Sequence, residues 1–298
     1  MKHKWVVIFL KGIGIGAANV IPGVSGGTIA LITGIYEELI HSLKSFNLTA
    51  LKFILKGDIK GFAKYVNLNF LIAVFLGVVV SILFIAKILD YLFINYPVYI
   101  WAYFFGLIMA SVFFVGKTIS RWSVIILILF VVGAIVAGGI AILPIAAENN
   151  SFLYLLLCGI VSVCSMILPG LSGSFVLILM GNYKLLMIDS INHFDFMILL
   201  PFFIGIIVGL LGFSYLLSWI FGHYRDQTIA LLTGFIFGSL AILWPWKHEI
   251  TATFGNQVKI VGYERFIPEH FDTQVLLVIV YAILGIVSIW IIEKLATK

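Results

Sequence analysis

Two short stretches rich in glycine and serine interrupt apolar sequence, and both carry groups suited to binding an anion. The first reads IPGVSGG, Ile21 to Gly27, and the second reads ILPGLSGS, Ile167 to Ser174. Proline and glycine are the least favourable residues inside a helix, so each stretch predicts a break followed by a new helix. The start of a helix offers free N–H groups with partial positive charge, and glycine lets a ligand approach the backbone. With the serine hydroxyls, these groups predict a phosphate site.

The candidate phosphate-binding residues are those at which the second helix of each pair starts. Serine is a favoured helix cap, and hydroxyls add donors. The predicted set is Ser25, Gly26, Gly27, Thr28, Ser172, Gly173 and Ser174. A simpler interpretation is that the breaks only pack two helices tightly. Their repetition favours function, because broken backbone at membrane depth survives only inside protein or beside a polar cavity.

Three further side chains are candidates for gating or proton relay: Asn19, Glu37 and Lys184. Asn19 is polar within an apolar segment and can satisfy broken backbone. Glu37 and Lys184 occupy matching places after the two breaks, and ionisable groups are costly within apolar segments. The alternative is that both charged side chains extend to the membrane surface.

The composition indicates an all-α polytopic membrane protein. Hydrophobic residues make up 62% of the 298 residues and charged residues only 10%, whereas soluble domains carry roughly 25% charged residues. Apolar residues run continuously and do not alternate as they do in membrane β-barrels. Cys158 and Cys164 lie in an apolar stretch, so we interpret them as small core residues.

Six apolar windows of about 20 residues predict transmembrane helices. They are Leu68–Leu92, Val98–Gly116, Trp122–Leu143, Met197–Phe221, Thr228–Trp246 and Gln274–Ile292. Four shorter segments flank the two breaks: Trp5–Val20, Thr28–His41, Phe152–Leu168 and Phe175–Ile188. At 1.5 Å per residue they reach roughly 21–26 Å, less than the ~30 Å hydrocarbon core. We expect two re-entrant hairpins, although ten full spans fit the charges equally well.

The chain contains an internal repeat. An offset of 147 residues matches the two breaks, with Gly34 on Gly181 and Tyr36 on Tyr183. Later matches use an offset of 132 for the first span, such as Gly77 on Gly209, and 128 for the second. The predicted domains are residues 1–143 (hairpin 5–41, basic segment 44–67, three spans) and 144–298 (hairpin 152–188, three spans). Because each repeat contains three spans, an odd number, the second repeat is inverted relative to the first. Inverted repeats are the architecture of secondary transporters, in which the substrate site lies near the midplane of the membrane.

The segment 44–67 predicts an amphipathic helix on the inner leaflet, held partly by anionic membrane lipids. Lys52, Lys56, Lys60 and Lys64 are four residues apart and share one helix face. The alternative is a solvated basic loop. The other long loop, 247–273, carries mixed charge and predicts no function.

Basic residues predict that both termini are cytoplasmic, because Lys and Arg are enriched in cytoplasmic loops. The N-terminal sequence resembles a signal peptide, but no convincing cleavage site follows Lys11, so we expect it to be retained.

The segments KGIGIGAANVIPGVSGGTIALITGIYEELI and SMILPGLSGSFVLILMGNYKLL resemble the two signatures of a bacterial family of polyprenyl-phosphate transporters, the undecaprenyl-phosphate translocases. The resemblance covers nearly the whole chain. It implies transfer of undecaprenyl phosphate from the outer to the inner leaflet of the bacterial cytoplasmic membrane, where the lipid serves cell-envelope synthesis. The family's turns match Pro22–Gly27 and Pro169–Ser174. Members often carry aspartate where this chain has Asn19, so this chain lacks that carboxylate for proton coupling.

The residues and the resemblance together predict a transporter working by alternating access around a phosphate at the two tips. The alternatives are a carrier of a small anion or metabolite, an intramembrane enzyme, and a structural protein. No HExxH, GxSxG, paired catalytic aspartates or nucleotide-binding motif occurs in the sequence. We therefore expect no enzyme activity, no cofactor, no metal and no nucleic-acid partner. A homo-oligomer is compatible with the sequence.

Overall fold

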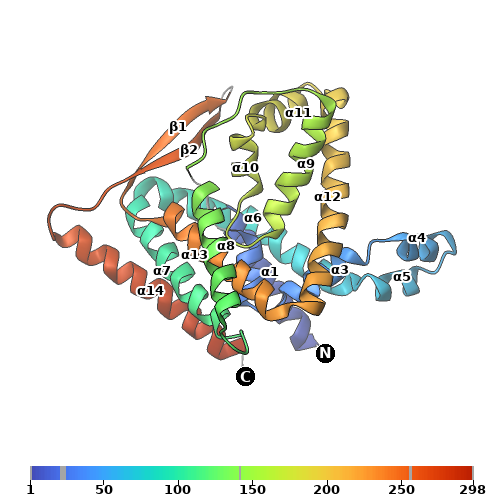
Figure 1. Ribbon diagram of the computed structural model, residues 1–298, viewed down its shortest axis with the longest axis horizontal. Coiled ribbons are helices and arrows are strands. Elements are labelled where there is room, and N and C mark those ends of the chain that lie inside the picture. Colours follow the sequence, from blue (N-terminus) through green and yellow to red (C-terminus); the bar gives the residue numbers. More distant parts are fainter. Residues whose placement is uncertain (1, 21–24, 141, 255–256, 297–298) are drawn as a thin grey trace.

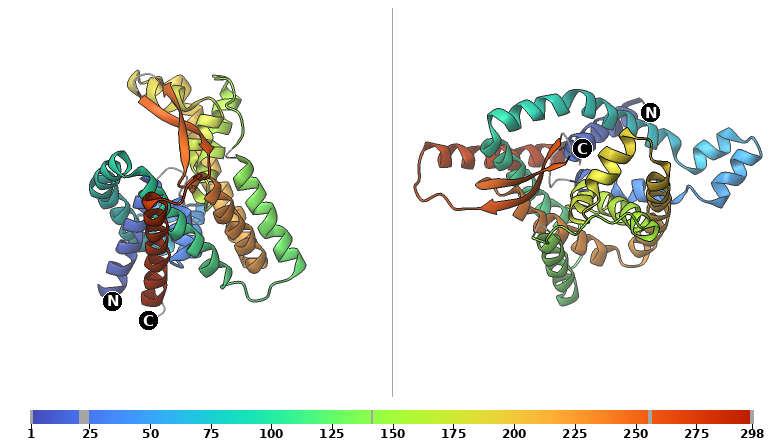
Figure 2. Two further views of the ribbon diagram at one scale, coloured as in Figure 1. Left: turned by 90° about the vertical axis from the view of Figure 1, so that its left-hand side faces the viewer. Right: turned by 90° about the horizontal axis from the view of Figure 1, so that it is seen from above.

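The computed structural model is a bundle of apolar helices with one protruding helical pair and one β-hairpin (Figures 1 and 2). It describes residues 2–20, 25–140, 142–254 and 257–296. The N-terminal end of α1 and the C-terminal end of α14 lie at the same end of the molecule, and α11 lies at the opposite end (Figure 1). We call these the terminal end and the far end.

Each predicted hairpin contains two breaks, not one. In the first, α1 (Lys2–Val20) is followed by α2 (Gly26–Ile32) and α3 (Tyr36–Lys44). In the second, α9 (Phe152–Ile167) is followed by α10 (Gly173–Leu179), the π-helical turn η1 (Leu185–Asp189) and α11 (Ser190–Asn192). Pro22 and Gly23 of the first turn lie outside the described residues.

The prediction of continuous helices over Thr28–His41 and Phe175–Ile188 is wrong. Gly34 and Gly181 both adopt a φ of 73° and end α2 and α10 early. Only glycine visits this left-handed region routinely. The two extra breaks occupy matching places at the offset of 147 residues.

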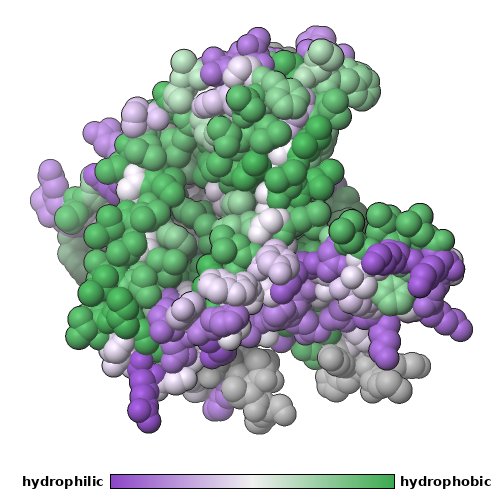
Figure 3. Space-filling view, turned by 45° about the vertical axis from the view of Figure 1, so that its right-hand side comes forward, coloured by the Kyte–Doolittle hydropathy of each residue, from purple (hydrophilic) through white to green (hydrophobic). Residues whose placement is uncertain are grey.

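The spanning helices agree with the apolar windows. They are α6 (Leu68–Asn95), α7 (Pro97–Gly116), α8 (Val124–Ile140), α12 (Phe196–His223), α13 (Arg225–Leu243) and α14 (Thr273–Ala296). Among the described residues, five of them are long and apolar enough to cross a membrane, and α8 is shorter, with 17 residues. Apolar side chains cover the middle of the face in Figure 3, and hydrophilic residues gather at its two ends.

The helices pack in pairs, and glycines lie at the contacts. Helix α1 packs on α6, α9 on α12, α7 on α14 and α8 on α13, while α7 and α13 also pack on each other. A Cβ at Gly77 would collide with the carbonyl oxygen of Phe9, and one at Gly205 with that of Leu156. Small residues at such contacts let helix backbones approach closely in membranes.

These contacts correct the predicted alignment of the first spans. Phe9 and Leu156 differ by the hairpin offset of 147 residues, so their partners Gly77 and Gly205 are the matching pair. The offset is therefore 128, the same as for the second spans, and Gly209 is not the counterpart of Gly77. The error of four residues is close to one helical turn, so both alignments place apolar residues on similar faces.

The basic segment is also not one helix. It forms α4 (Leu48–Leu55) and α5 (Ile59–Tyr65), which protrude from the bundle (Figure 1). Gly57 separates them with a φ of 71°, and Asp58 caps α5 by accepting from the N–H of Gly61. The four lysines therefore do not share a single helix face.

Part of the loop 247–273 folds into an antiparallel β-hairpin, β1 (Lys247–Phe254) and β2 (Gln257–Arg265). Its base is fixed to α7 by Lys247, whose ammonium lies 3.2 Å from the centre of the Trp101 ring and 4.0 Å from that of Tyr263. Figure 1 shows the hairpin at the far end.

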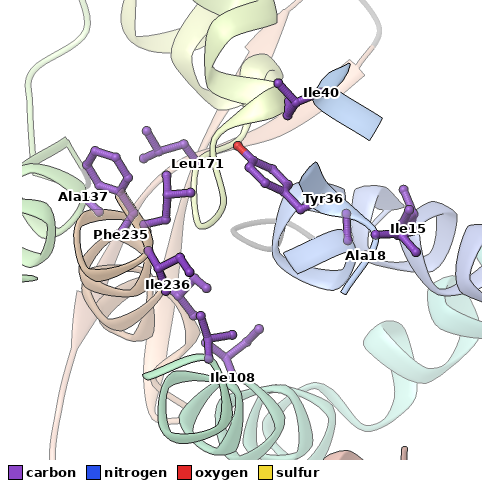
Figure 4. Close-up of a cluster of buried hydrophobic side chains, with 14 of the residues drawn as sticks. Ile15, Ala18, Tyr36, Ile40, Ile108, Ala137, Leu171, Phe235 and Ile236 are labelled. Carbon is purple, nitrogen blue, oxygen red and sulfur yellow. The ribbon is translucent and has the colours of Figure 1, made fainter. Parts of the chain in front are cut away.

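The central core joins both halves of the chain. Figure 4 shows Leu171, from the second break, beside Phe235 of α13, and Tyr36 of α3 with its hydroxyl directed towards the second hairpin. All three side chains are buried. The core therefore holds the two breaks at the centre of the molecule.

Candidate functional site

The two broken turns meet and bond to each other. Ser25, at the start of α2, is 2% exposed, and its hydroxyl lies 3.1 Å from the carbonyl oxygen of Leu168 and 3.3 Å from that of Met166. Thr28 is 1% exposed, and its hydroxyl oxygen accepts from the N–H of Gly170 at 2.9 Å. A Cβ at Gly27 would collide with the carbonyl oxygen of Ile167. The first turn thus packs directly against the second.

The carbonyl groups at the end of α9 find their partners in the first hairpin. The last carbonyls of any helix lack partners within it, and unpaired groups are costly when buried. Ser25 donates to this end, and the hydroxyl of Tyr36 donates to the carbonyl of Ile167 at 3.1 Å. Sequence reasoning did not include Tyr36 among the site residues, although its match with Tyr183 was a signal.

The first turn satisfies its own N–H groups with side chains. The amide oxygen of Asn19 accepts from the N–H of Gly26 at 2.8 Å, and the hydroxyl of Ser25 accepts from the N–H of Gly27 at 3.1 Å. Asn19 therefore closes the broken backbone, as the sequence predicted for it. The predicted anion donors Gly26 and Gly27 are already bonded within the protein.

The second turn is less fully bonded. Ser172 caps α10 by position, but no side-chain cap bond forms there among the described residues. The hydroxyls of Ser172 and Ser174 lie 3.1 Å apart, and Ser174 is exposed. Two hydroxyls therefore lie beside the uncapped start of α10.

A cavity of about 490 Å³ adjoins the second turn. Its lining includes polar side chains from both hairpins, namely Asn19, Ser25, Ser162, Ser172 and Ser174. Its remaining wall is apolar and is built by α9, α10, α12 and the η1–α11 segment, through residues such as Met166, Leu177, Met187, Ile191 and Phe203. The cavity thus combines a few polar groups with a mostly apolar lining.

The predicted gate residues do not meet each other. Glu37 forms an ion pair with Arg225 at 3.0 Å, at the junction of α12 and α13. Lys184 pairs with Asp189 one turn away on its own hairpin. The Lys184 ammonium donates a hydrogen bond to the Asp189 carboxylate, so its charge is already paired within its own hairpin.

A family model and two known proteins match most of this chain. A family model described as undecaprenyl phosphate translocase-like matches residues 15–261. A polyprenyl-phosphate transporter of Vibrio cholerae serotype O1 is 38% identical over 304 residues, covering 99% of this chain and 98% of the relative. A polyprenyl-phosphate transporter of Staphylococcus aureus is 28% identical over 264 residues, covering 82% of this chain and 87% of the relative. No solved structure matches significantly.

Proposed function

This chain belongs to the undecaprenyl phosphate translocase-like family, and from that premise we propose that it moves undecaprenyl phosphate from the outer to the inner leaflet of the bacterial cytoplasmic membrane. It is a transporter and not an enzyme. The lipid combines one small anionic head with a long apolar tail, and the transporter must accept both.

The cavity beside the second turn is the observation that carries this proposal. Its polar lining offers the hydroxyls of Ser172 and Ser174 and the amide of Asn19, beside the uncapped start of α10. Its apolar wall includes exposed side chains such as Met187 and Phe203, which are suited to contact with lipid. A lipid whose phosphate binds these polar groups can therefore keep its tail against the apolar lining.

The two turns have different roles in this proposal. Ser172, Gly173 and Ser174 bind the phosphate, and Asn19 and Ser25 lie beside it. Gly26, Gly27 and Thr28 position the first turn against the second, because their polar groups or close contacts are already used within the protein. A Cβ at Gly173 would collide with the Ser162 carbonyl oxygen and the Met166 side chain, so glycine there keeps the start of α10 close to α9.

We further propose that residues 1–143 and 144–298 are inverted repeats. Matching close contacts support this. Gly106 meets Ala282 and Gly234 meets Phe130, while Gly285 meets Tyr103 and Gly133 meets Leu231. Gly106 and Tyr103 of α7 precede Gly234 and Leu231 of α13 by 128 residues. Phe130 and Gly133 of α8 precede Ala282 and Gly285 of α14 by 152 residues. An odd number of spans in each half makes such repeats antiparallel, as in secondary transporters.

Orientation follows from the positive-inside rule. With the terminal end in the cytoplasm, the basic α4–α5 segment lies at the inner leaflet. Leu48, Leu55 and Ile59 of that segment are exposed apolar side chains, alongside exposed Lys52 and Lys60. This arrangement supports an interfacial segment that contacts anionic lipids. Both termini are then cytoplasmic.

A carrier of a small anion or metabolite is the alternative. Such a carrier needs a polar passage and no apolar wall reaching lipid. The mostly apolar lining of the cavity favours the lipid substrate.

The test is a leaflet-flip assay. Purified protein is reconstituted into liposomes with labelled undecaprenyl phosphate on one side, and the label's accessibility is followed over time. We expect the wild type to flip the lipid and Ser172→Ala/Ser174→Ala to flip it at least tenfold more slowly, with Ser151→Ala as a control on the same hairpin. Uptake of inorganic phosphate without lipid flipping would favour the small-anion carrier. Normal flipping by the double variant would remove the proposed head-group site.

A further inference from the structure

One contact between the halves lies towards the terminal end of the molecule. Helix α3 of the first hairpin packs against the last turns of α12 (Figure 1). Ser218 of α12 lies 3.0 Å from His41 and 3.2 Å from Lys44, and the Lys44 ammonium lies 4.6 Å from the centre of the Tyr215 ring. Tyr36 packs on Phe221 with ring centres 5.8 Å apart.

The matching contact at the far end is not made. The offsets of 147 and 128 residues place Ile191 where Lys44 lies and Lys87 where Tyr215 lies. Yet among the described residues, neither η1 nor α11 packs extensively on α6. Ile191 is 47% exposed and lines the cavity, and Lys87 is exposed on α6. The same hairpin face is therefore packed in one half and open in the other.

We infer that the α3–α12 contact is the cytoplasmic gate, and that the structure is the state open towards the outer leaflet. In the opposite state, the η1–α11 segment packs on α6 and brings Ile191 against Lys87, while α3 leaves α12. This inference rests on the proposed function, because it assumes that the bound phosphate passes between the two leaflets.

Two features of the described residues fit this exchange. Most polar side chains around the α3–α12 contact are accessible, although Ser218 is buried: His41 is exposed and Lys44 is half-buried. Beside this contact, Glu37 of α3 pairs with Arg225 at the start of α13, and their side chains are 42% and 51% exposed. Exposed ion pairs contribute little stability, so such a contact can open at small cost. The η1 segment is a π-helical turn, a rare conformation that often marks functional sites.

The test cross-links each gate in turn. In a parent carrying Cys158→Ala and Cys164→Ser, one variant adds Lys44→Cys and Tyr215→Cys, and the other adds Lys87→Cys and Ile191→Cys. A short, cleavable bismaleimide is applied in liposomes. The control pairs Ile191→Cys with Ile82→Cys, which is exposed on another side of α6.

We expect both gate pairs to cross-link, the control pair to stay separate, and each cross-link to slow undecaprenyl phosphate flipping at least tenfold until it is cleaved. If the 87–191 pair never cross-links while that variant flips lipid at the parental rate, the inference is wrong and the proposed function stands. Cross-linking of both pairs in a parent that flips no lipid supports the gates and removes only the proposed substrate.

Discussion

Thr28 and Gly170 connect the two broken turns of this protein, since the Thr28 hydroxyl oxygen accepts from the Gly170 N–H at 2.9 Å although 142 residues separate them. Both residues are buried. A threonine in one turn thus replaces the partner that a continuous helix would supply to the other.

Replacing Thr28 by valine should destabilise the protein, because it leaves the buried Gly170 N–H without an acceptor. A buried unsatisfied donor costs about 1–3 kcal/mol. Thermal unfolding in detergent should shift downward for Thr28→Val and stay close to wild type for Thr28→Ser, which keeps the hydroxyl. Equal stability of the valine and serine variants would show that the bond contributes nothing.

Gly106→Ala should destabilise the contact between α7 and α14, because the added Cβ collides with the backbone oxygen of Ala282. Overpacking of this kind costs about 1–3 kcal/mol. Gly139→Ala is the matched control, since no atom lies within 4 Å of a Cβ at that helical position. The comparison is made by thermal unfolding, and a normal transition for Gly106→Ala would mean that the helices can separate freely.

Reversing the charge of Arg225 should weaken the packing of α3 at the junction of α12 and α13. Arg225→Glu places two carboxylates together at Glu37, and exposed pairs are worth roughly 0.2–1 kcal/mol. The yield of the 44–215 cross-link should therefore fall up to about fivefold, and Glu37→Arg combined with Arg225→Glu should restore it. Arg121→Glu serves as the control at another exposed position. A yield that is unchanged by Arg225→Glu would exclude this ion pair from the gate.

Neutralising the lysines of α4 and α5 should reduce the effect of anionic lipid. Each Lys near an anionic surface contributes about 1 kcal/mol. We expect wild-type flipping to be faster in liposomes containing phosphatidylglycerol than in pure phosphatidylcholine, and the variant with Lys52, Lys56, Lys60 and Lys64 changed to Gln to lose most of that difference. Lys117→Gln is the control. A full response in the quadruple variant would favour a merely solvated segment.

Much of this fold follows from hydrophobicity, because membrane helices need about 20 apolar residues. The six windows therefore located α6, α7, α8, α12, α13 and α14, and the repeated Pro-Gly-x-Ser-Gly pattern located the second break. The sequence located helix ends less well where a single glycine ends the helix. Gly34 and Gly181 lie in apolar helical patterns, and only their positive φ shows that they end a helix.

Two other features escaped prediction for physical reasons. The four-residue spacing of Lys52 to Lys64 favours one helix, but Gly57 and Asp58 stop α4 and start α5. The β-hairpin was missed although Gly255-Asn256 separates two runs rich in β-branched residues, a usual hairpin signal. At the site, the sequence predicted the serines and glycines themselves. Which of them bind phosphate and which position one turn against the other depends on hydrogen bonds and contacts between the two halves, which the sequence does not reveal.

Helices of one half pack on helices of the other half, and this has a consequence for membrane insertion during synthesis. Helix α8 finds its main partner in α13, and α7 finds one in α14, so neither pairing exists until most of the chain has entered the membrane. Likewise, carbonyl groups at the end of α9 accept hydrogen bonds from the hydroxyls of Ser25 and Tyr36, which are synthesised long before α9. The first half must therefore remain in the bilayer with these contact surfaces unpacked. The bundle can pack completely only after the last helix has been synthesised and inserted.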